Sequence, residues 1–170
     1  KDLEDFNPHI VGLTNYIWNE RISCEFAKYV KKFHPDIVTL FGGPNYPLDL
    51  VEKEKFLTAH PEIDFYLPLD AEIAFRDILK LLREKDFDLK LVKENGPIDG
   101  VEFIYQGKFM SGKTLPRLQV TEIPSPYLLG MFDKFLNPNW EPLVITSRGC
   151  PFKCTFCEEG QDYYSKVHFR

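Results

Sequence analysis

The chain has 170 residues, a hydrophobic content of 44%, 15 phenylalanines and a formal net charge of −5. This is enough apolar material for one ordinary domain core, with room for part of a second domain. The negative balance argues against a protein that binds nucleic acid mainly through its phosphates. We find no run of about eighteen apolar residues, so no membrane span is expected. The charged opening Lys1-Asp2-Leu3-Glu4-Asp5 lacks the apolar region of a signal peptide.

Cysteine usage predicts the redox compartment. Only four cysteines occur, and three of them are clustered near the C-terminus. A secreted disulfide framework would spread cysteines along a short chain, so a reducing compartment fits this pattern better. We therefore expect a cytoplasmic protein.

The first part of the chain alternates between two hydrophobic patterns. Strands are expected at residues 9–17, where the strand should be buried, and at 36–41 and 63–67, with helices at 20–33, 48–59 and 71–85. The apolar face of the first long helix is expected to comprise Ile22, Phe26, Tyr29, Val30 and Phe33. Alternating strands and helices imply βαβ units with helices on both faces of a parallel sheet. The predicted fold is a doubly wound, flavodoxin- or Rossmann-like α/β domain.

After residue 87 the pattern changes. Residues 101–105 and 109–110, separated by Gln-Gly-Lys, predict a β-hairpin. A connector over 115–126 contains three prolines, which disfavour regular structure and indicate a domain boundary. A short helix is expected at 127–135, followed by a strand at 142–147.

Three cysteines follow that last strand: Cys150, Cys154 and Cys157, in the spacing Cx3Cx2C. Three thiolates on one short loop can converge on a metal and leave one coordination position open, whereas structural zinc sites close with a fourth ligand. Thiolates select iron–sulfur clusters, zinc or Cu(I) over hard cations.

This spacing, with the aromatic Phe156 before the last cysteine and the apolar run at 143–146 ahead of it, resembles the signature of the radical S-adenosylmethionine (radical SAM) superfamily. The resemblance implies the first strand and cluster loop of a (β/α) barrel, with the three cysteines holding a [4Fe–4S] cluster. It implies that SAM chelates the fourth iron and that Phe156 lies at its adenine. Reductive cleavage of SAM would yield a 5′-deoxyadenosyl radical, with flavodoxin or ferredoxin as the type of electron donor.

The N-terminal part resembles the cobalamin-binding-type domain found ahead of such barrels. The matching segments are 11–16, Gly42-Gly43-Pro44 and 70–75. The resemblance implies that Gly42 and Gly43 lie along the nucleotide tail of cobalamin, and that Thr14, which falls where the family often has a serine, also binds cobalamin. Glycines at a strand end let a backbone approach a ligand closely. The Asp-x-His-x-x-Gly motif of the lower cobalt ligand is absent, and Leu69-Asp70-Ala71 replaces a glycine-rich turn. Gly42-Gly43 as a mere tight turn is therefore the competing interpretation.

The expected domains are 1–118, a cobalamin-binding-type domain incomplete at its N-terminus, then a linker at 119–140 and the start of the radical SAM domain at 141–170. A full barrel takes about 250 residues, so we interpret the chain as an internal fragment of a longer enzyme. Alone it is expected to be inactive, because the barrel wall that shields the radical is missing. The substrate, small molecule or macromolecule, cannot be read from the sequence, and no catalytic side chain is nominated.

Two alternatives stay open. One is a zinc-binding α/β interaction module without catalysis, in which His168 could supply the fourth ligand and Cys24 is distant in sequence. The other is a degenerate Rossmann-like binding domain with an inert cysteine loop. Cys24 itself is interpreted as a small buried hydrophobe. His9, His34 and His60 are interpreted as helix-end or surface residues rather than metal ligands.

Overall fold

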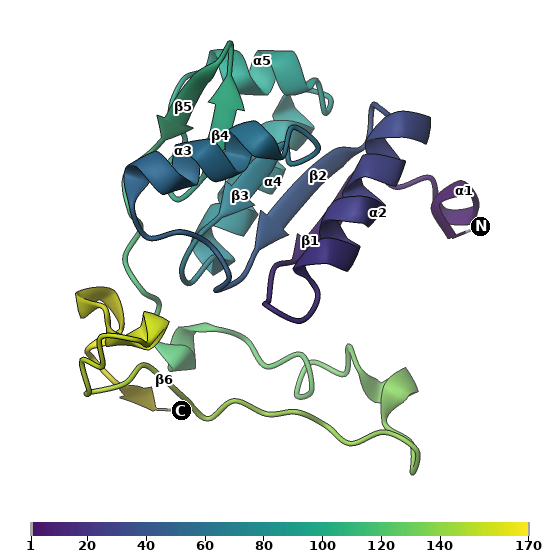
Figure 1. Ribbon diagram of the computed structural model, residues 1–170. Helices are drawn as coiled ribbons and strands as arrows, with labels where there is room; N and C mark the ends of the chain where they lie inside the picture. The colour runs from purple at the N-terminus through teal and green to yellow at the C-terminus, as the bar shows by residue number, and fades with distance from the viewer. Residues whose placement is uncertain (1, 170) are drawn as a thin grey trace. The chain divides into compact units, whose positions relative to one another are not determined.

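The computed structural model describes residues 2–169, which form two compact units, Lys1–Leu115 and Pro116–Arg170. The first unit is an α/β domain whose helices lie on both faces of one sheet (Figure 1). The second unit has little regular structure. The finer three-part division expected at residues 118 and 140 stays a prediction.

The sheet has five strands in the order β1-β2-β3-β4-β5. β1 (Ile10–Thr14), β2 (Val38–Gly42) and β3 (Phe65–Leu67) are parallel, which confirms the predicted βαβ units. β4 (Glu102–Tyr105) and β5 (Lys108–Ser111) form the predicted hairpin and run antiparallel. The sheet is therefore mixed, and its strand order does not reverse within the described residues, so the prediction of a doubly wound parallel sheet is corrected.

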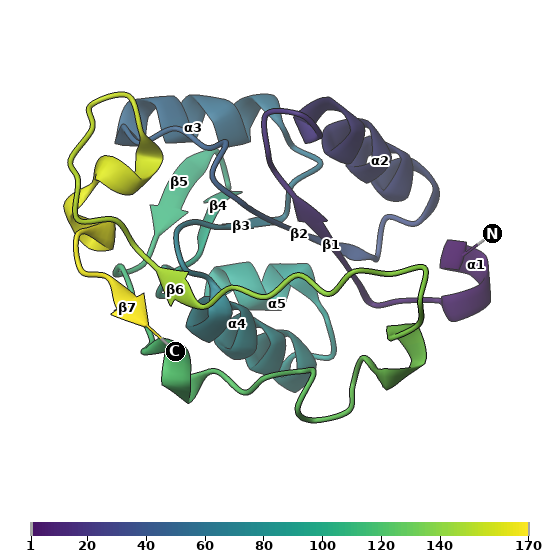
Figure 2. The same ribbon diagram turned by 90° about the horizontal axis from the view of Figure 1, so that it is seen from below.

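Helices cover both faces of this sheet. Helices α2 (Glu20–Phe33) and α3 (Leu50–Ala59) lie on one face, and α4 (Glu72–Glu84) and α5 (Leu89–Glu94) lie on the other (Figure 2). Successive strand residues point to opposite faces, so β2 serves two cores. Val38 and Leu40 pack in a cluster with α4 and α5, while Phe41 packs in a separate cluster with α2 and α3.

The buried face of α2 differs from the prediction. Ser23, Cys24, Ala27 and Val30 are its buried residues. The larger side chains of the predicted face are exposed: Ile22 by 72%, Phe26 by 39%, Tyr29 by 49% and Phe33 by 55%. Val30 is the member of the predicted face that is buried, as expected. Both sets of residues recur at helical spacing, and the prediction favoured the larger side chains. Small side chains on the inner face let the helix lie close to the sheet.

Three other differences have simple physical causes. β1 is half-buried rather than buried, because it is an edge strand of the described sheet. The five-residue α1 (Asp2–Phe6) and the six-residue α5 were not predicted, since such short helices carry little periodic signal. The Asp88 side chain caps α5 by accepting a hydrogen bond from the backbone N–H of Leu91 at 3.0 Å.

The second unit contains the cysteine loop. Its regular parts are short: η1 (Val120–Glu122), η2 (Asp133–Phe135), η3 (Glu158–Gly160), η4 (Asp162–Tyr164), and a two-stranded sheet of β6 (Ser147–Arg148) with β7 (His168–Phe169).

Two predicted elements of this second unit are absent in the expected form. The helix expected at 127–135 is reduced to η2. The strand expected at 142–147 is wrong except at Ser147, and Leu143, Val144 and Ile145 are 82%, 58% and 57% exposed. A strand needs a neighbour to complete its hydrogen-bond ladder, and no described strand pairs with 143–145.

None of the helices within residues 2–169 combines the length and apolarity needed to cross a bilayer.

Candidate functional site

The carboxyl ends of the three parallel strands meet at one edge of the sheet. Thr14 pairs in register with Gly42, and Gly42 pairs with Leu67. In open α/β sheets, ligands bind beyond this edge. The structure thus brings Thr14 and the Gly42-Gly43 turn together.

Thr14 is exposed at the end of β1, but its side chain is fixed. Its Oγ1 accepts a hydrogen bond from Asn19 Nδ2 at 2.7 Å, and its backbone carbonyl accepts one from Ser23 Oγ at 2.8 Å. The Asn19 Oδ1 in turn accepts a hydrogen bond from the Tyr16 backbone N–H at 2.8 Å. Because Thr14 Oγ1 acts as an acceptor here, its own hydroxyl proton can be donated to a ligand.

The glycine turn is shaped by the protein's own backbone. Gly43 has φ +126°, and a β-carbon there would lie 2.5 Å from the Asn15 carbonyl oxygen. At Gly42 it would lie 3.3 Å from the Leu67 carbonyl oxygen. The space at Gly43 is therefore filled by the neighbouring loop, which accounts for this glycine without a ligand.

Sequence reasoning missed a buried polar network beneath this turn. Asn15 is fully buried, and its Nδ2 donates to the Asn45 carbonyl at 2.5 Å and to the Tyr66 hydroxyl at 3.2 Å. Tyr66 donates onward to the Gly43 carbonyl at 2.8 Å. The only sequence signal was the position of Asn15 after a strand end, because its partners lie 30 and 51 residues away.

An aromatic pair supports the network. Tyr46 stacks on Tyr66 with ring centroids 3.7 Å apart. Burial, together with the nearby Glu102 carboxylate, raises the pKa of Tyr46 well above its usual range. The phenol therefore stays neutral at physiological pH and acts as a core residue.

The turn after β3, Leu69-Asp70-Ala71, contains no glycine, although the cobalamin-binding-type domains that it resembles have a glycine-rich turn there. Its backbone nevertheless includes a conformation typical of glycine. Leu69 has φ +62°, in the left-handed region that glycine adopts without cost. Leu69 therefore takes a conformation that suits the glycine-rich turn it replaces.

In the second unit, all three loop cysteines are free thiols. Cys150 is half-buried, and Cys154 and Cys157 are exposed. The Cys150 backbone N–H donates to the Tyr164 carbonyl at 3.0 Å, and that of Cys157 donates to the Cys154 carbonyl at 3.1 Å. Phe156 is 91% exposed. Three free soft donors on one accessible loop fit an iron–sulfur cluster chemically.

Gly149, directly before Cys150, lies closely packed against the backbone of residues 164 and 166. Its φ is +98°, and a β-carbon there would lie 2.5 Å from the Lys166 carbonyl oxygen and 2.7 Å from that of Tyr164. His168, the ligand considered for a zinc alternative, is buried, and its Nδ1 lies 2.6 Å from Gln119 Oε1.

One group of metal-ligating side chains converges elsewhere. Within residues 2–169, the set of three or more such residues whose ligand atoms all lie within 4.8 Å of one another is Cys24, His60 and Glu62, in the first unit. The three loop sulfurs are not that close together in the described structure. A cluster binds each thiolate to a different iron and so does not require them to meet at a single ion.

The first unit is thus an α/β domain of Rossmann-like type, with polar and glycine residues at the edge where such domains bind ligands. No family model matches the chain. It is 33% identical over 159 residues to the cobalamin-dependent radical SAM methyltransferase TokK of Streptomyces tokunonensis. It is 31% identical over 163 residues to the 2-(S-pantetheinyl)-carbapenam-3-carboxylate methyltransferase of Streptantibioticus cattleyicolor. It is also 30% identical over 167 residues to an uncharacterized methyltransferase of Pyrococcus horikoshii.

These matches cover 90%, 91% and 96% of this chain. The chain spans only 22% of the length of the first two relatives and 34% of the third. The chain is homologous to the N-terminal part of cobalamin-dependent radical SAM methyltransferases, which confirms the resemblance predicted from its residues.

Proposed function

We propose that this protein works as part of a radical SAM enzyme that uses cobalamin and transfers a methyl group. The observation that carries the proposal is the Cx3Cx2C loop, whose three thiols are free, in a chain homologous to such methyltransferases. Methyl transfer is the reaction class that the relatives' names share. The methyl acceptor is not specified by any residue of this chain.

Cys150, Cys154 and Cys157 would hold a [4Fe–4S] cluster. When bound, such a cluster supplies the electron that cleaves SAM reductively. The chain's own residues fix the backbone of the loop. The Cys150 N–H donates a hydrogen bond to the Tyr164 carbonyl, and the Cys157 N–H donates one to the Cys154 carbonyl. The exposed ring of Phe156 is free to stack on a purine.

Cobalamin would bind at the strand-end edge of the first unit. Thr14 fits this role, because its hydroxyl is exposed, oriented by Asn19 and able to donate a hydrogen bond. Gly43 does not offer an open cradle, because the Asn15 carbonyl fills the space beside it. We assign no cobalt ligand to this chain, since the Asp-x-His-x-x-Gly motif is absent from its sequence.

The cluster is tested by anaerobic reconstitution of the chain with iron and sulfide. We expect a broad absorbance near ~400 nm, where thiolate-ligated clusters absorb. Cys154→Ala should lose it, and the matched control Cys24→Ser should keep it. Equal spectra for wild type and Cys154→Ala, or one tightly bound zinc at the loop in place of iron, would refute the assignment.

Cobalamin binding is tested separately by titration with hydroxocobalamin. We expect a saturable spectral change that is weakened in Thr14→Val, which removes the hydroxyl. Thr58→Val is the control, because Thr58 is also exposed but lies in α3. A titration without spectral change, or equal affinities in all three proteins, contradicts this part of the proposal and leaves the cluster untouched.

A further inference from the structure

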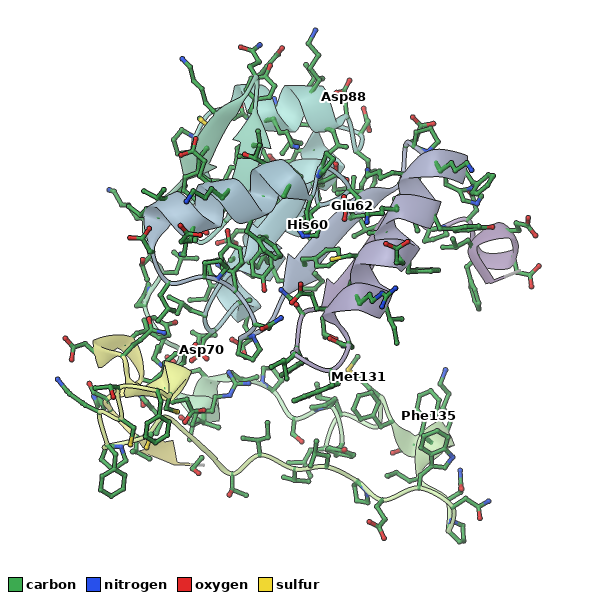
Figure 3. All side chains as sticks on the ribbon, in the orientation of Figure 1. His60, Glu62, Asp70, Asp88, Met131 and Phe135 are labelled. Atoms are coloured by element: carbon green, nitrogen blue, oxygen red, sulfur yellow. The ribbon has the colours of Figure 1, made fainter. Side chains whose placement is uncertain are left out.

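Cys24, His60 and Glu62 form a compact group that neither the cysteine loop nor the strand-end edge uses. Cys24 lies in α2, His60 is the C-cap of α3, and Glu62 lies between α3 and β3. Their ligand atoms all lie within 4.8 Å of one another. Figure 3 shows His60 and Glu62 side by side on the sheet face that α2 and α3 cover. Two segments, α2 and the His60-Pro61-Glu62 stretch after α3, thus bring a sulfur, a nitrogen and an oxygen donor close together.

The separation of His60 and Glu62 is close to that of two ligands on a single small cation. His60 Nδ1 lies 2.9 Å from Glu62 Oε1. Two donors that each stand about 2 Å from one tetrahedral ion are roughly 3.3 Å apart. The observed separation is close to that distance, so only a small adjustment would place both atoms on one ion.

The burial of the group favours a cation over an uncharged packing role. Glu62 is 5% exposed and Cys24 is 4% exposed. The carboxylate of Glu62 contacts the ring of His60, whose side chain is 23% exposed. A buried carboxylate is costly unless a positive charge compensates it. The His60 imidazole supplies a positive charge only when it is protonated, whereas a divalent ion supplies one in addition to a coordination bond.

We propose that Cys24, His60 and Glu62 bind one zinc ion. A thiolate, an imidazole and a carboxylate are the three ligand types of protein zinc sites. Three protein ligands leave the fourth position for water or an exogenous ligand. The ion would tie α2 to the segment between α3 and β3, so it would stabilise the folded first unit. This site is independent of the proposed cluster, which uses other cysteines.

The test begins with a protein whose loop thiols are removed, the triple variant Cys150→Ala, Cys154→Ala, Cys157→Ala. Co²⁺ serves as the spectroscopic probe, and Zn²⁺ competes with it. We expect one Co²⁺ per chain, a thiolate charge-transfer band, displacement by one Zn²⁺, and a higher melting temperature with Zn²⁺ present. A triple variant that binds neither metal overturns the proposal.

Ligand variants in the same background test which residues bind. Cys24→Ser should abolish the charge-transfer band. His60→Gln should weaken Zn²⁺ binding by more than ~100-fold, since loss of even an outer-shell partner costs about 10–100-fold. His34→Gln is the matched control: His34 also caps a helix, α2, with a similar backbone and precedes a proline, yet it lies outside the group.

Circular dichroism verifies that each variant is folded. His60 is partly exposed at a helix end, so we expect His60→Gln to fold. It therefore tests the site even if Cys24→Ser does not fold. Equal Zn²⁺ affinity in His60→Gln and His34→Gln would contradict the site.

Discussion

Gly43 and Asn15 lie in direct backbone contact at the strand-end edge of the sheet. A β-carbon on Gly43 would stand 2.5 Å from the Asn15 carbonyl oxygen, and that carbonyl accepts a hydrogen bond from the Asn45 backbone N–H at 3.1 Å. The loops after β1 and β2 are therefore locked together. Any ligand at this edge meets a preformed surface rather than two independent loops.

Replacing this glycine should be costly. Gly43→Ala combines a backbone conformation that side chains rarely adopt with a clash against backbone, so we expect a loss of about 2–5 kcal/mol in unfolding free energy. Gly12→Ala is the control, because nothing lies within 4 Å of the added carbon. It should change stability by less than about 1 kcal/mol. Urea denaturation measures both, and similar losses would show that the Gly43–Asn15 contact is not restrictive.

Leu69 should tolerate replacement by glycine unusually well. Its φ of +62° costs a non-glycine residue about 1–2 kcal/mol, and Leu69→Gly relieves this strain while losing partial burial. We expect a net change within about 1 kcal/mol. The control Leu79→Gly, at a half-buried position inside α4, should destabilise by more than about 2 kcal/mol. Thermal unfolding of both proteins distinguishes the outcomes, and equal losses would disprove the account of this turn.

The burial of Lys93 should make the stability of the folded protein depend on pH. Burial lowers the pKa of Lys93, whose ammonium lies over the rings of Phe65 and Phe103 at 5.3 and 5.8 Å. The folded-state pKa is thus below the unfolded value of 10.5, so the unfolded chain holds more protons between these two values. The stability of the wild type relative to Lys93→Met should therefore rise with pH up to about 10.5 and be lowest below the folded pKa.

Urea denaturation of wild type and Lys93→Met at several pH values measures this difference. Comparing the two proteins at each pH cancels the other titrating groups to first order. A difference that does not change with pH, or that falls as pH rises, would contradict the lowered pKa.

Gly149 should control cluster assembly through geometry alone. Gly149→Ala would press a carbon onto the carbonyls of Tyr164 and Lys166, which shifts the chain just ahead of Cys150. We expect less iron per chain after reconstitution. Gly107→Ala has the same left-handed strain of about 1–2 kcal/mol but no atom within 4 Å, and should reconstitute like wild type. Equal iron content in both variants would show that the loop does not depend on this contact.

Much of the first unit was predictable because its signals are local. Apolar runs defined β2 and β3, the spacing before Pro35 defined α2, and the Gln-Gly-Lys turn defined the hairpin. The orientation of α2 was not predictable, because Phe26 and the buried Ala27 lie on neighbouring stripes with the same period. Choosing between them requires knowledge of how closely the helix approaches the sheet.

The candidate sites also combine features that have a local sequence signal with features that have none. Gly42 was expected directly after a strand, whereas Thr14 was nominated through the family resemblance alone and lay inside the longer strand predicted at 9–17. The register of β1 and β2 places the two side by side. The bond between Asn15 and Tyr66 spans 51 residues and leaves no local signal. The strand expected before Cys150 failed for a related reason: apolar residues such as Ile145 suit a strand, but strand formation also requires a paired neighbour.

The most direct test of the central claim is the response of the reduced, reconstituted cluster to SAM. The reconstituted protein should contain roughly four irons per chain. Its electron paramagnetic resonance spectrum should show a [4Fe–4S] signal. That signal should change when SAM is added, because one iron lacks a protein ligand. Cys157→Ala should lose the signal. A signal that ignores SAM would contradict an open coordination position, and one that persists without Cys157 would contradict the ligand assignment.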